Sequence, residues 1–142
     1  MNVKVLFCKG RSIVFMFVRR LEDCQQFIAG DCSLLREFFH PDKEQLNIGY
    51  SLAHAEVLPG ETTCCHRIKQ SSEVYYIIDG EGLMHINNQQ FSVEKGCAIY
   101  IPEGANQYIK NVGKNILKFL CIVSPPWQAD NEEVEKKEKG SS

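Results

Sequence analysis

A chain of 142 residues, 44% of them hydrophobic, is long enough to close one hydrophobic core and too short for two ordinary domains. Its last thirteen residues hold five acids and three lysines, which leaves thirteen basic and thirteen acidic side chains in residues 1–129. A neutral body has no broad field that would attract a polyphosphate. We therefore expect one domain that does not bind nucleic acid.

The apolar run "SIVFMFV", residues 12–18, stands before Arg19 and Arg20. Seven apolar residues are too few to span a bilayer, and no small-residue cleavage site follows them. The seven cysteines are an odd number without a CxxC pair, which favours reduced thiols and a cytoplasmic protein. Met16 is an alternative to Met1 as the initiator, because "MFVRRLEDC" begins like a globular protein.

A short helix is predicted over residues 33–39, "SLLREFF". Its leucines and phenylalanines have helical spacing, and Asp31 and Ser33 before them are good N-cap residues. The helix should end before His40 and Pro41, since the residue before a proline disfavours helical backbone. Residues 1–41 are thus expected to form an N-terminal extension that contains this helix.

Residues 42–128 show the pattern of an antiparallel β-sandwich or barrel. Short apolar runs alternate with turn residues such as Pro59-Gly60, Asp79-Gly80 and Asn87-Asn88. The eight runs are "YSLAHAEVL", "TTCCHRI", "EVYYII", "LMHI", "QFSV", "CAIYI", "QYIK" and "ILKFLCIV". The charged tail, residues 129–142, is predicted to be disordered, because it buries too little apolar surface to offset its chain entropy.

Two segments match the spacing of two motifs that are typical of the cupin superfamily. The first motif is G-x5-H-x-H-x4-E-x6-G, and the second is G-x5-P-x-G-x2-H-x3-N. Eight of the ten fixed positions are kept, with Ile68 and Gln107 in place of the other two histidines: Gly60, His66, Glu73, Gly80, Gly96, Pro102, Gly104 and Asn111. The chain resembles small single-domain prokaryotic cupins of the kind called mannose-6-phosphate-isomerase-like. The resemblance implies an all-β, double-stranded β-helix, which is a jelly-roll barrel.

Strand alternation places Cys64, His66 and Ile68 on one face, and Glu73 and Tyr75 on one face of the next strand. If His66 points into the barrel, Cys64 and Ile68 point inward too and line the pocket. An inward glutamate is costly to bury unless it meets a metal ion, a cation or a hydrogen-bond donor. Glu73 is therefore a candidate catalytic residue, as is Tyr75, whose hydroxyl could donate a proton or only pack in the barrel.

The resemblance implies a metal site at His66, Glu73 and Gln107, and Ile68 stands at the missing ligand position. One imidazole, one carboxylate and one neutral amide favour Mn²⁺, or a weakly held Fe²⁺ or Zn²⁺. Cys64 could add a thiolate, or could be a small buried apolar residue. The alternative is a metal-free barrel in which Glu73 accepts hydrogen bonds from His66 and Gln107.

Two functions follow from these alternatives. One is a metal-assisted isomerase or oxygenase that acts on a small polar metabolite, such as a sugar derivative. The other is a non-catalytic barrel that binds or senses a small molecule at a degenerate site. In either case we expect a homodimer, in which residues near Val14 to Arg20 contribute an edge strand.

Overall fold

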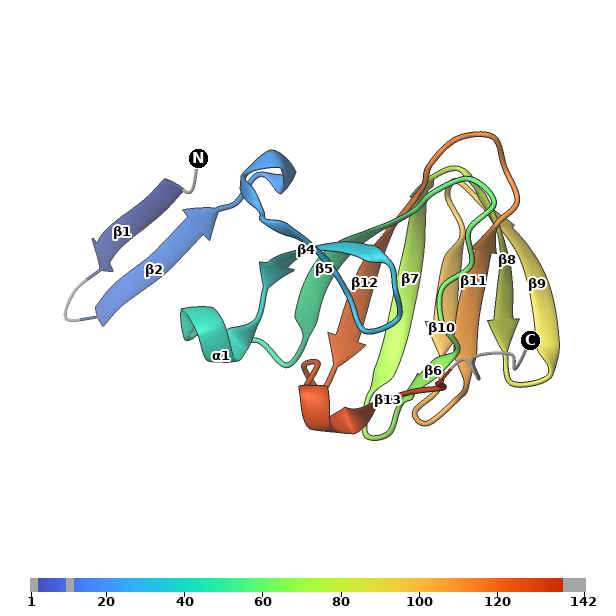
Figure 1. The fold of residues 1–142 in the computed structure, drawn as a ribbon. Helices are drawn as coiled ribbons and strands as arrows, with labels where there is room; N and C mark the ends of the chain where they lie inside the picture. Colours follow the sequence, from blue (N-terminus) through green and yellow to red (C-terminus); the bar gives the residue numbers. More distant parts are fainter. Residues whose placement is uncertain (1–2, 10–11, 137–142) are drawn as a thin grey trace.

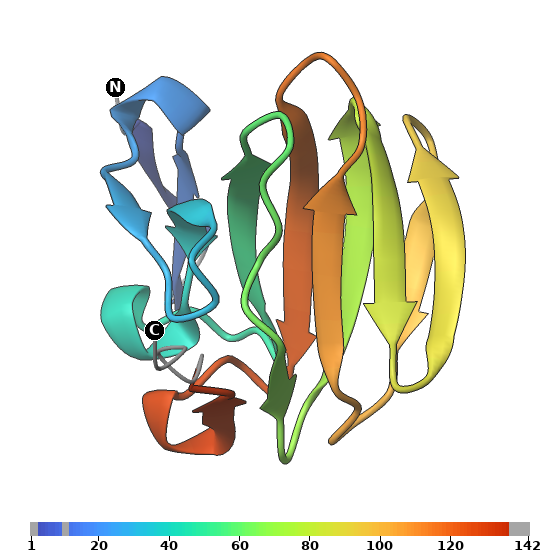
Figure 2. The same cartoon turned by 45° about the vertical axis from the view of Figure 1, so that its right-hand side comes forward.

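The prediction of an all-β jelly roll is confirmed. The computed structural model describes residues 3–9 and 12–136, and two antiparallel sheets pack face to face (Figures 1 and 2). The first sheet has the order β10-β7-β12-β5-β4-β3. Its strands are Ala98–Ile101 (β10), Ser72–Asp79 (β7), Leu117–Ser124 (β12), Ser51–Val57 (β5), Leu34–Phe39 (β4) and Gln26–Ile28 (β3).

The second sheet has the order β13-β6-β11-β8-β9. Its strands are Glu132–Val134 (β13), His66–Ile68 (β6), Gln107–Asn111 (β11), Glu81–Ile86 (β8) and Gln89–Glu94 (β9). Three short helices lie outside the sheets: Leu21–Asp23 (η1), Pro41–Glu44 (α1) and Ala129–Asn131 (η2). None of the helices in the described part of the chain is long and apolar enough to cross a membrane.

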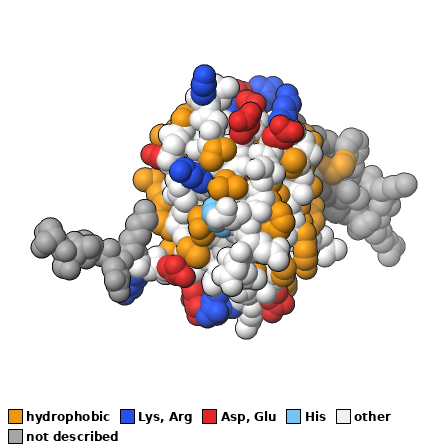
Figure 3. Space-filling model, turned by 90° about the vertical axis from the view of Figure 1, so that its right-hand side faces the viewer, with side chains coloured by type: hydrophobic (Ala, Val, Ile, Leu, Met, Phe, Trp, Pro, Cys, Tyr) orange, Lys and Arg blue, Asp and Glu red, His pale blue; other side chains and the backbone are white. Residues whose placement is uncertain are grey.

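The core lies between the two sheets, where alternate side chains of each strand point inward. Its largest fully buried apolar side chains come from five strands: Ile77, Met84, Ile101, Ile109, Leu117 and Phe119. Each of the eight apolar runs in the sequence overlaps a strand of one of the two sheets. On the side seen in Figure 3, hydrophobic side chains are scattered among polar ones, and charged side chains gather toward the top and bottom.

Gly80 shows why a motif glycine is required by the fold alone. Its φ is +92°, a left-handed conformation that side chains disfavour, and it joins β7 to β8. A Cβ atom added there would lie 2.9 Å from the Cα of Leu117. The glycine therefore permits both a tight reversal and a close approach to β12.

The helix predicted over residues 33–39 is wrong, because residues 34–39 form strand β4 between β3 and β5. Two ladders of backbone hydrogen bonds outweigh a helix of two turns, for which nucleation is unfavourable. The carboxylate of Asp31 accepts hydrogen bonds from the backbone N–H and the hydroxyl of Ser33, so the expected cap builds the β3–β4 turn. The helix starts later, at Pro41, where the His40 ring accepts from the Asp42 N–H at 3.3 Å.

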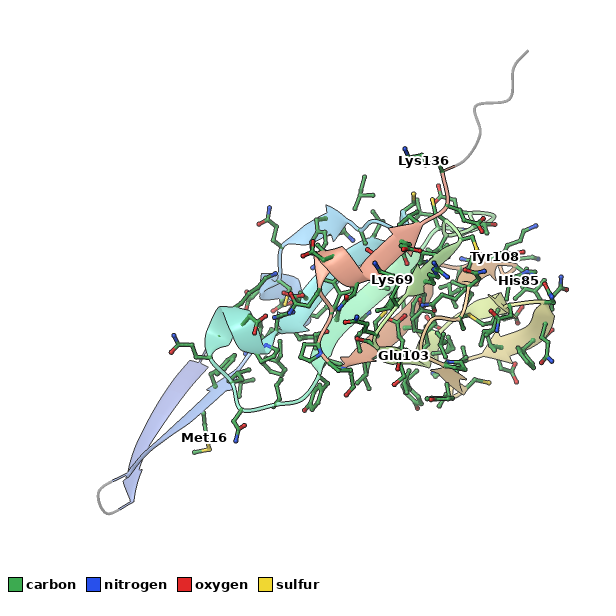
Figure 4. All side chains as sticks on the ribbon, turned by 90° about the horizontal axis from the view of Figure 1, so that it is seen from below. Met16, Lys69, His85, Glu103, Tyr108 and Lys136 are labelled. Carbon is green, nitrogen blue, oxygen red and sulfur yellow. The ribbon has the colours of Figure 1, made fainter. Side chains whose placement is uncertain are left out.

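Ahead of the barrel, β1 (Val3–Lys9) and β2 (Ser12–Val18) form a separate two-stranded sheet. The hairpin extends away from the barrel, and Met16 on β2 lies far from the two sheets (Figures 1 and 4). At its base, Arg19 donates to the Phe38 carbonyl and pairs with Glu44 at 2.7 Å. Phe17 also packs edge-on against Phe39, with ring centroids 5.3 Å apart.

We expect a homodimer built through this hairpin, since β2 pairs with β1 alone among the strands of the described residues. Light scattering at micromolar concentration should give twice the chain mass of 16.2 kDa. Deletion of residues 1–18 should give a monomer whose barrel remains folded. A monomeric mass for the full chain would contradict this prediction.

The prediction of a disordered tail is wrong for residues 129–136, which form a short helix and a strand. Residues 137–142 lie outside the described residues. β13 pairs with β6, and η2 lies just before it. Backbone hydrogen bonds join Lys69 N to Asn131 O at 2.8 Å and Glu135 N to Cys65 O at 2.9 Å. The charged composition hid this strand, because an edge strand beside β6 needs few apolar residues of its own.

Removal of residues 130–142 should lower the melting temperature by about 5 °C or more, because β13 and its backbone hydrogen bonds are lost. Removal of residues 137–142 alone keeps β13 and is the matched control, for which we expect a change within about 1 °C. Differential scanning calorimetry on both variants tests this. Equal melting temperatures for the two variants would show that β13 adds no stability.

Candidate functional site

A cavity of about 240 Å³ is lined by residues of the β3–β4 turn, of the C-terminal segment and of strands from both sheets. Its polar lining includes Asp31, His66, Glu73, Tyr75 and Glu132. Small-molecule sites for drug-sized ligands hold about 300 to 1,000 Å³, so this one suits a smaller metabolite. Four larger hollows, of about 330, 340, 500 and 710 Å³, contain none of these five residues.

His66 begins β6 and is 3% exposed. Its Nδ1 lies 3.0 Å from the Cys64 carbonyl oxygen, which can only accept, so Nδ1 carries a proton. Nε2 is therefore the ring nitrogen that remains to interact with other groups in the cavity. Asp31 Oδ2 lies 3.9 Å from that nitrogen, while Asp31 Oδ1 is held by Ser33. The turn thus aims one carboxylate oxygen at the imidazole.

Glu73 and Gln107 form the second polar pair, on β7 of one sheet and β11 of the other. Gln107 Nε2 donates to Glu73 Oε1 at 2.9 Å, and both side chains are almost completely buried. Burial raises the pKa of Glu73 from its ordinary 4.5 to about 8, although the Gln107 hydrogen bond opposes the rise. At neutral pH Glu73 is therefore mainly a neutral carboxylic acid, which can donate a proton.

Tyr75 lies two residues after Glu73 and lines the same cavity, as strand alternation predicts. Its ring packs against Phe119, with centroids 4.5 Å apart. Burial and the nearby Glu73 carboxyl raise the pKa of Tyr75 well above its ordinary value. The hydroxyl therefore stays neutral and can both donate and accept a hydrogen bond.

Ile68 is 4% exposed and lines the cavity, at the position where the cupin motif has its second histidine. In the register of β13 and β6, Glu132 stands directly opposite Ile68, so the two side chains share a face. Glu132 also lines the cavity, and burial raises its pKa, while His66 opposes that rise. A carboxylate from the C-terminal segment thus lies beside the missing imidazole position.

Sequence reasoning missed two of the cavity's acids. Asp31 was visible only as a capping residue of the expected helix, and Glu132 belonged to the tail that was expected to be disordered. The placement of Cys64 in the pocket is not supported either. Its sulfur lies 2.6 Å from that of Cys32, and it is not among the residues that line the cavity.

Comparison with known proteins decides the family. A model of the cupin domain matches residues 53–123. An uncharacterized protein of Methanocaldococcus jannaschii is 40% identical over 108 residues, which cover 76% of this chain and 86% of that protein. The chain belongs to the cupin family.

Two solved cupins share the fold at low sequence identity. A predicted oxalate decarboxylase of Thermotoga maritima has a TM-score of 0.68 and 21% identity, over 76% of this cupin and 98% of that chain. A nucleoside dehydratase of Streptomyces has a TM-score of 0.65 and 16% identity, over 82% of this cupin and 88% of that chain. At these identities the likeness concerns the fold alone.

The donor set of this cupin does not fit the metal site of three histidines and a glutamate that the family resemblance implies. Ile68 cannot bind a metal ion, and Gln107 offers a neutral amide whose nitrogen already donates to Glu73. His66 is then the single imidazole at the site. Within residues 3–9 and 12–136, no group of three His, Cys, Asp or Glu side chains is arranged to hold an ion.

Other polar side chains stabilise the fold and do not line the cavity. Asn111 is fully buried, and its amide donates to the carbonyls of Val57 and Asn115, each at 2.8 Å. Asn111 therefore fixes the loop before β12 and does not reach the cavity. His85 stacks on Tyr108 with ring centroids 4.0 Å apart, away from the cavity, as their labels show in Figure 4.

Proposed function

We propose that this cupin binds a small, non-anionic polar molecule, such as a neutral or amino sugar derivative, without the help of a metal ion. The observation that carries the proposal is the pairing of Ile68 and Gln107 at the two altered motif positions. Ile68 removes a ligand, and Gln107 ties Glu73 into a hydrogen bond that stands where a metal bond would be. The polar cavity that remains is a site for hydrogen bonding.

The charges around the cavity select the class of ligand. Four lining residues are acids: Asp31, Glu37, Glu73 and Glu132. Among the lining residues that the structure describes, Lys43 and His66 are the bases, and Lys43 already binds Glu37 at 2.6 Å. A dianion such as oxalate or a sugar phosphate would find no strong cation. Hydroxyl or ammonium donors would find Asp31, Glu132 and the Nε2 of His66.

A second candidate function is acid–base catalysis on the same ligand. Glu73 is a proton donor below its pKa of about 8, and the imidazole of His66 lines the same cavity. A carboxylic acid and an imidazole at one site can serve as general acid and general base in isomerisation or loss of water. The similar fold of a nucleoside dehydratase supports this candidate, because a dehydratase removes water from its substrate.

Thermal shift measurements with matched probes test the ligand class. Glucose and glucosamine, in the presence of EDTA, should raise the melting temperature by mass action, whereas oxalate and glucose 6-phosphate should not. His66→Gln should abolish the shift, and His85→Gln, at the stacked pair outside the cavity, should preserve it. Stabilisation by oxalate, or stabilisation that requires added Mn²⁺, Fe²⁺ or Zn²⁺, would contradict the proposal.

A further inference from the structure

Cys32 and Cys64 bring two sulfur atoms together from segments that are distant in the sequence. Their Sγ atoms lie 2.6 Å apart, closer than unbonded sulfur atoms pack and near the bonded distance of about 2.05 Å. Cys32 belongs to the turn between β3 and β4, and Cys64 lies just before β6. We propose that these residues form a reversible disulfide that locks the turn over the cavity.

The backbone around the two cysteines supports this assignment. Cys32 has φ of 71° in a tight turn in which its N–H donates to the Ala29 carbonyl at 2.9 Å. The Cys64 N–H donates to the Asp31 carbonyl at 2.7 Å, so the two segments are already joined one residue away from the sulfurs. The contact is therefore part of a built junction between the turn and the strand, not a chance approach of two long side chains.

The junction reaches the cavity from both of its sides. Asp31, which precedes Cys32, points a carboxylate oxygen at His66. The carbonyl oxygen of Cys64 accepts a hydrogen bond from the Nδ1–H group of His66. A bond between the two sulfurs would therefore hold Asp31 and His66 in their present relation, whereas the reduced pair leaves the turn able to separate from β6.

The chemistry is a thiol–disulfide exchange with a low-molecular-weight disulfide such as oxidised glutathione. The exposed Cys32 thiolate attacks one glutathione sulfur, and one molecule of reduced glutathione leaves. The Cys64 thiolate then attacks the Cys32 sulfur of the mixed disulfide and releases the second. Two protein thiols are oxidised, and one glutathione disulfide is reduced to two thiols.

Cys65 is the neighbouring thiol that competes least. Burial and the Glu135 carboxylate raise its pKa, which lowers its thiolate fraction, and its side chain is hydrogen-bonded to Glu135. Cys65 and Cys24 therefore provide matched serine variants. Each removes a cysteine close in sequence to one member of the pair and leaves the proposed bond intact.

Treatment of the native full chain with oxidised glutathione, followed by non-reducing tryptic peptide mapping, tests the bond. We expect a loss of two hydrogens and a link between peptides 21–36 and 44–67. The link should persist in Cys24→Ser and Cys65→Ser and disappear in Cys32→Ser and Cys64→Ser. A link that survives Cys32→Ser or Cys64→Ser, or protein that gains no link, would overturn the proposal.

A second experiment tests whether the disulfide holds the β3–β4 turn in place. Oxidation should slow amide hydrogen exchange at Cys64 and across residues 29–33, and should raise the melting temperature by roughly 10 °C, because the bond closes a loop of about thirty residues. Dithiothreitol should reverse both effects. A disulfide that forms without slower exchange in residues 29–33 would show that it does not hold the turn.

Discussion

Ile68→His should convert this cupin into a protein that binds Zn²⁺ or Ni²⁺ about 100-fold more tightly than the parent, which should bind weakly or not at all. Residue 68 shares its inward face with His66 and stands opposite Glu132. A second imidazole on that face adds a directional nitrogen ligand that water does not match. Isothermal titration calorimetry with the reduced protein measures the change.

Three further variants separate metal binding from a general effect of a polar residue at position 68. Ile68→Asn buries a polar side chain of similar size without an imidazole and should bind no more metal than the parent. Glu73→Gln in the Ile68→His background should reverse most of the gain, whereas Cys65→Ser, on the opposite face, should leave it unchanged. Equal metal affinity for the parent and for Ile68→His would mean that residue 68 does not face the site.

Glu73→Gln should change how the stability of the protein depends on pH. Because the pKa of Glu73 is about 8 in the folded state and 4.5 ordinarily, the folded state binds one more proton than the unfolded state between these values. The contribution of Glu73 to the free energy of unfolding of the parent should therefore be greatest below pH 4.5 and fall toward pH 8. The slope from this group is roughly 1.4 kcal/mol per pH unit, about 5 kcal/mol in all.

The glutamine variant keeps a neutral side chain at every pH and so lacks this loss. Urea unfolding from pH 4.5 to pH 8.5 should show parent and variant with similar stability at the acid end and the variant several kcal/mol more stable at the alkaline end. Glu133→Gln, a change at the surface partner of Arg67, is the control and should run parallel to the parent over this range. Parallel curves for Glu73→Gln and the parent would refute the raised pKa.

The barrel could be predicted from the sequence because its signals are local. Turn residues separate the eight apolar runs, and period-two alternation gives each strand an inner and an outer face. The motif spacing also identified His66 and Gln107, which the structure places on neighbouring strands, and Glu73, which bonds Gln107 from the facing sheet. The prediction of a helix over residues 33–39 was wrong because the apolar residues of this short segment fit both the helical period of 3.6 and the strand period of 2. In so short a segment, pairing with the neighbouring strands determines the structure.

Asp31 and Glu132 could not be predicted, because what brings them to the cavity is pairing between distant segments. Glu132 reaches the cavity only because β13 joins β6, some sixty residues earlier in the chain. Asp31 reaches the cavity because a turn replaces the expected helix cap. Neither contact leaves a periodic trace in the sequence around the residue itself. The acidic character of the cavity is thus a property of the tertiary structure.

The position of β13 also sets an order of events during synthesis. The sheet strands from β3 to β12 emerge from the ribosome before residues 129–136, and they can pair with one another in the nascent chain. Glu132 and Trp127 reach the cavity wall only afterwards. A chain that lacks residues 127–132 can therefore pair the strands of both sheets and still lack one wall of the cavity. Formation of the barrel and competence to hold a ligand are separate steps.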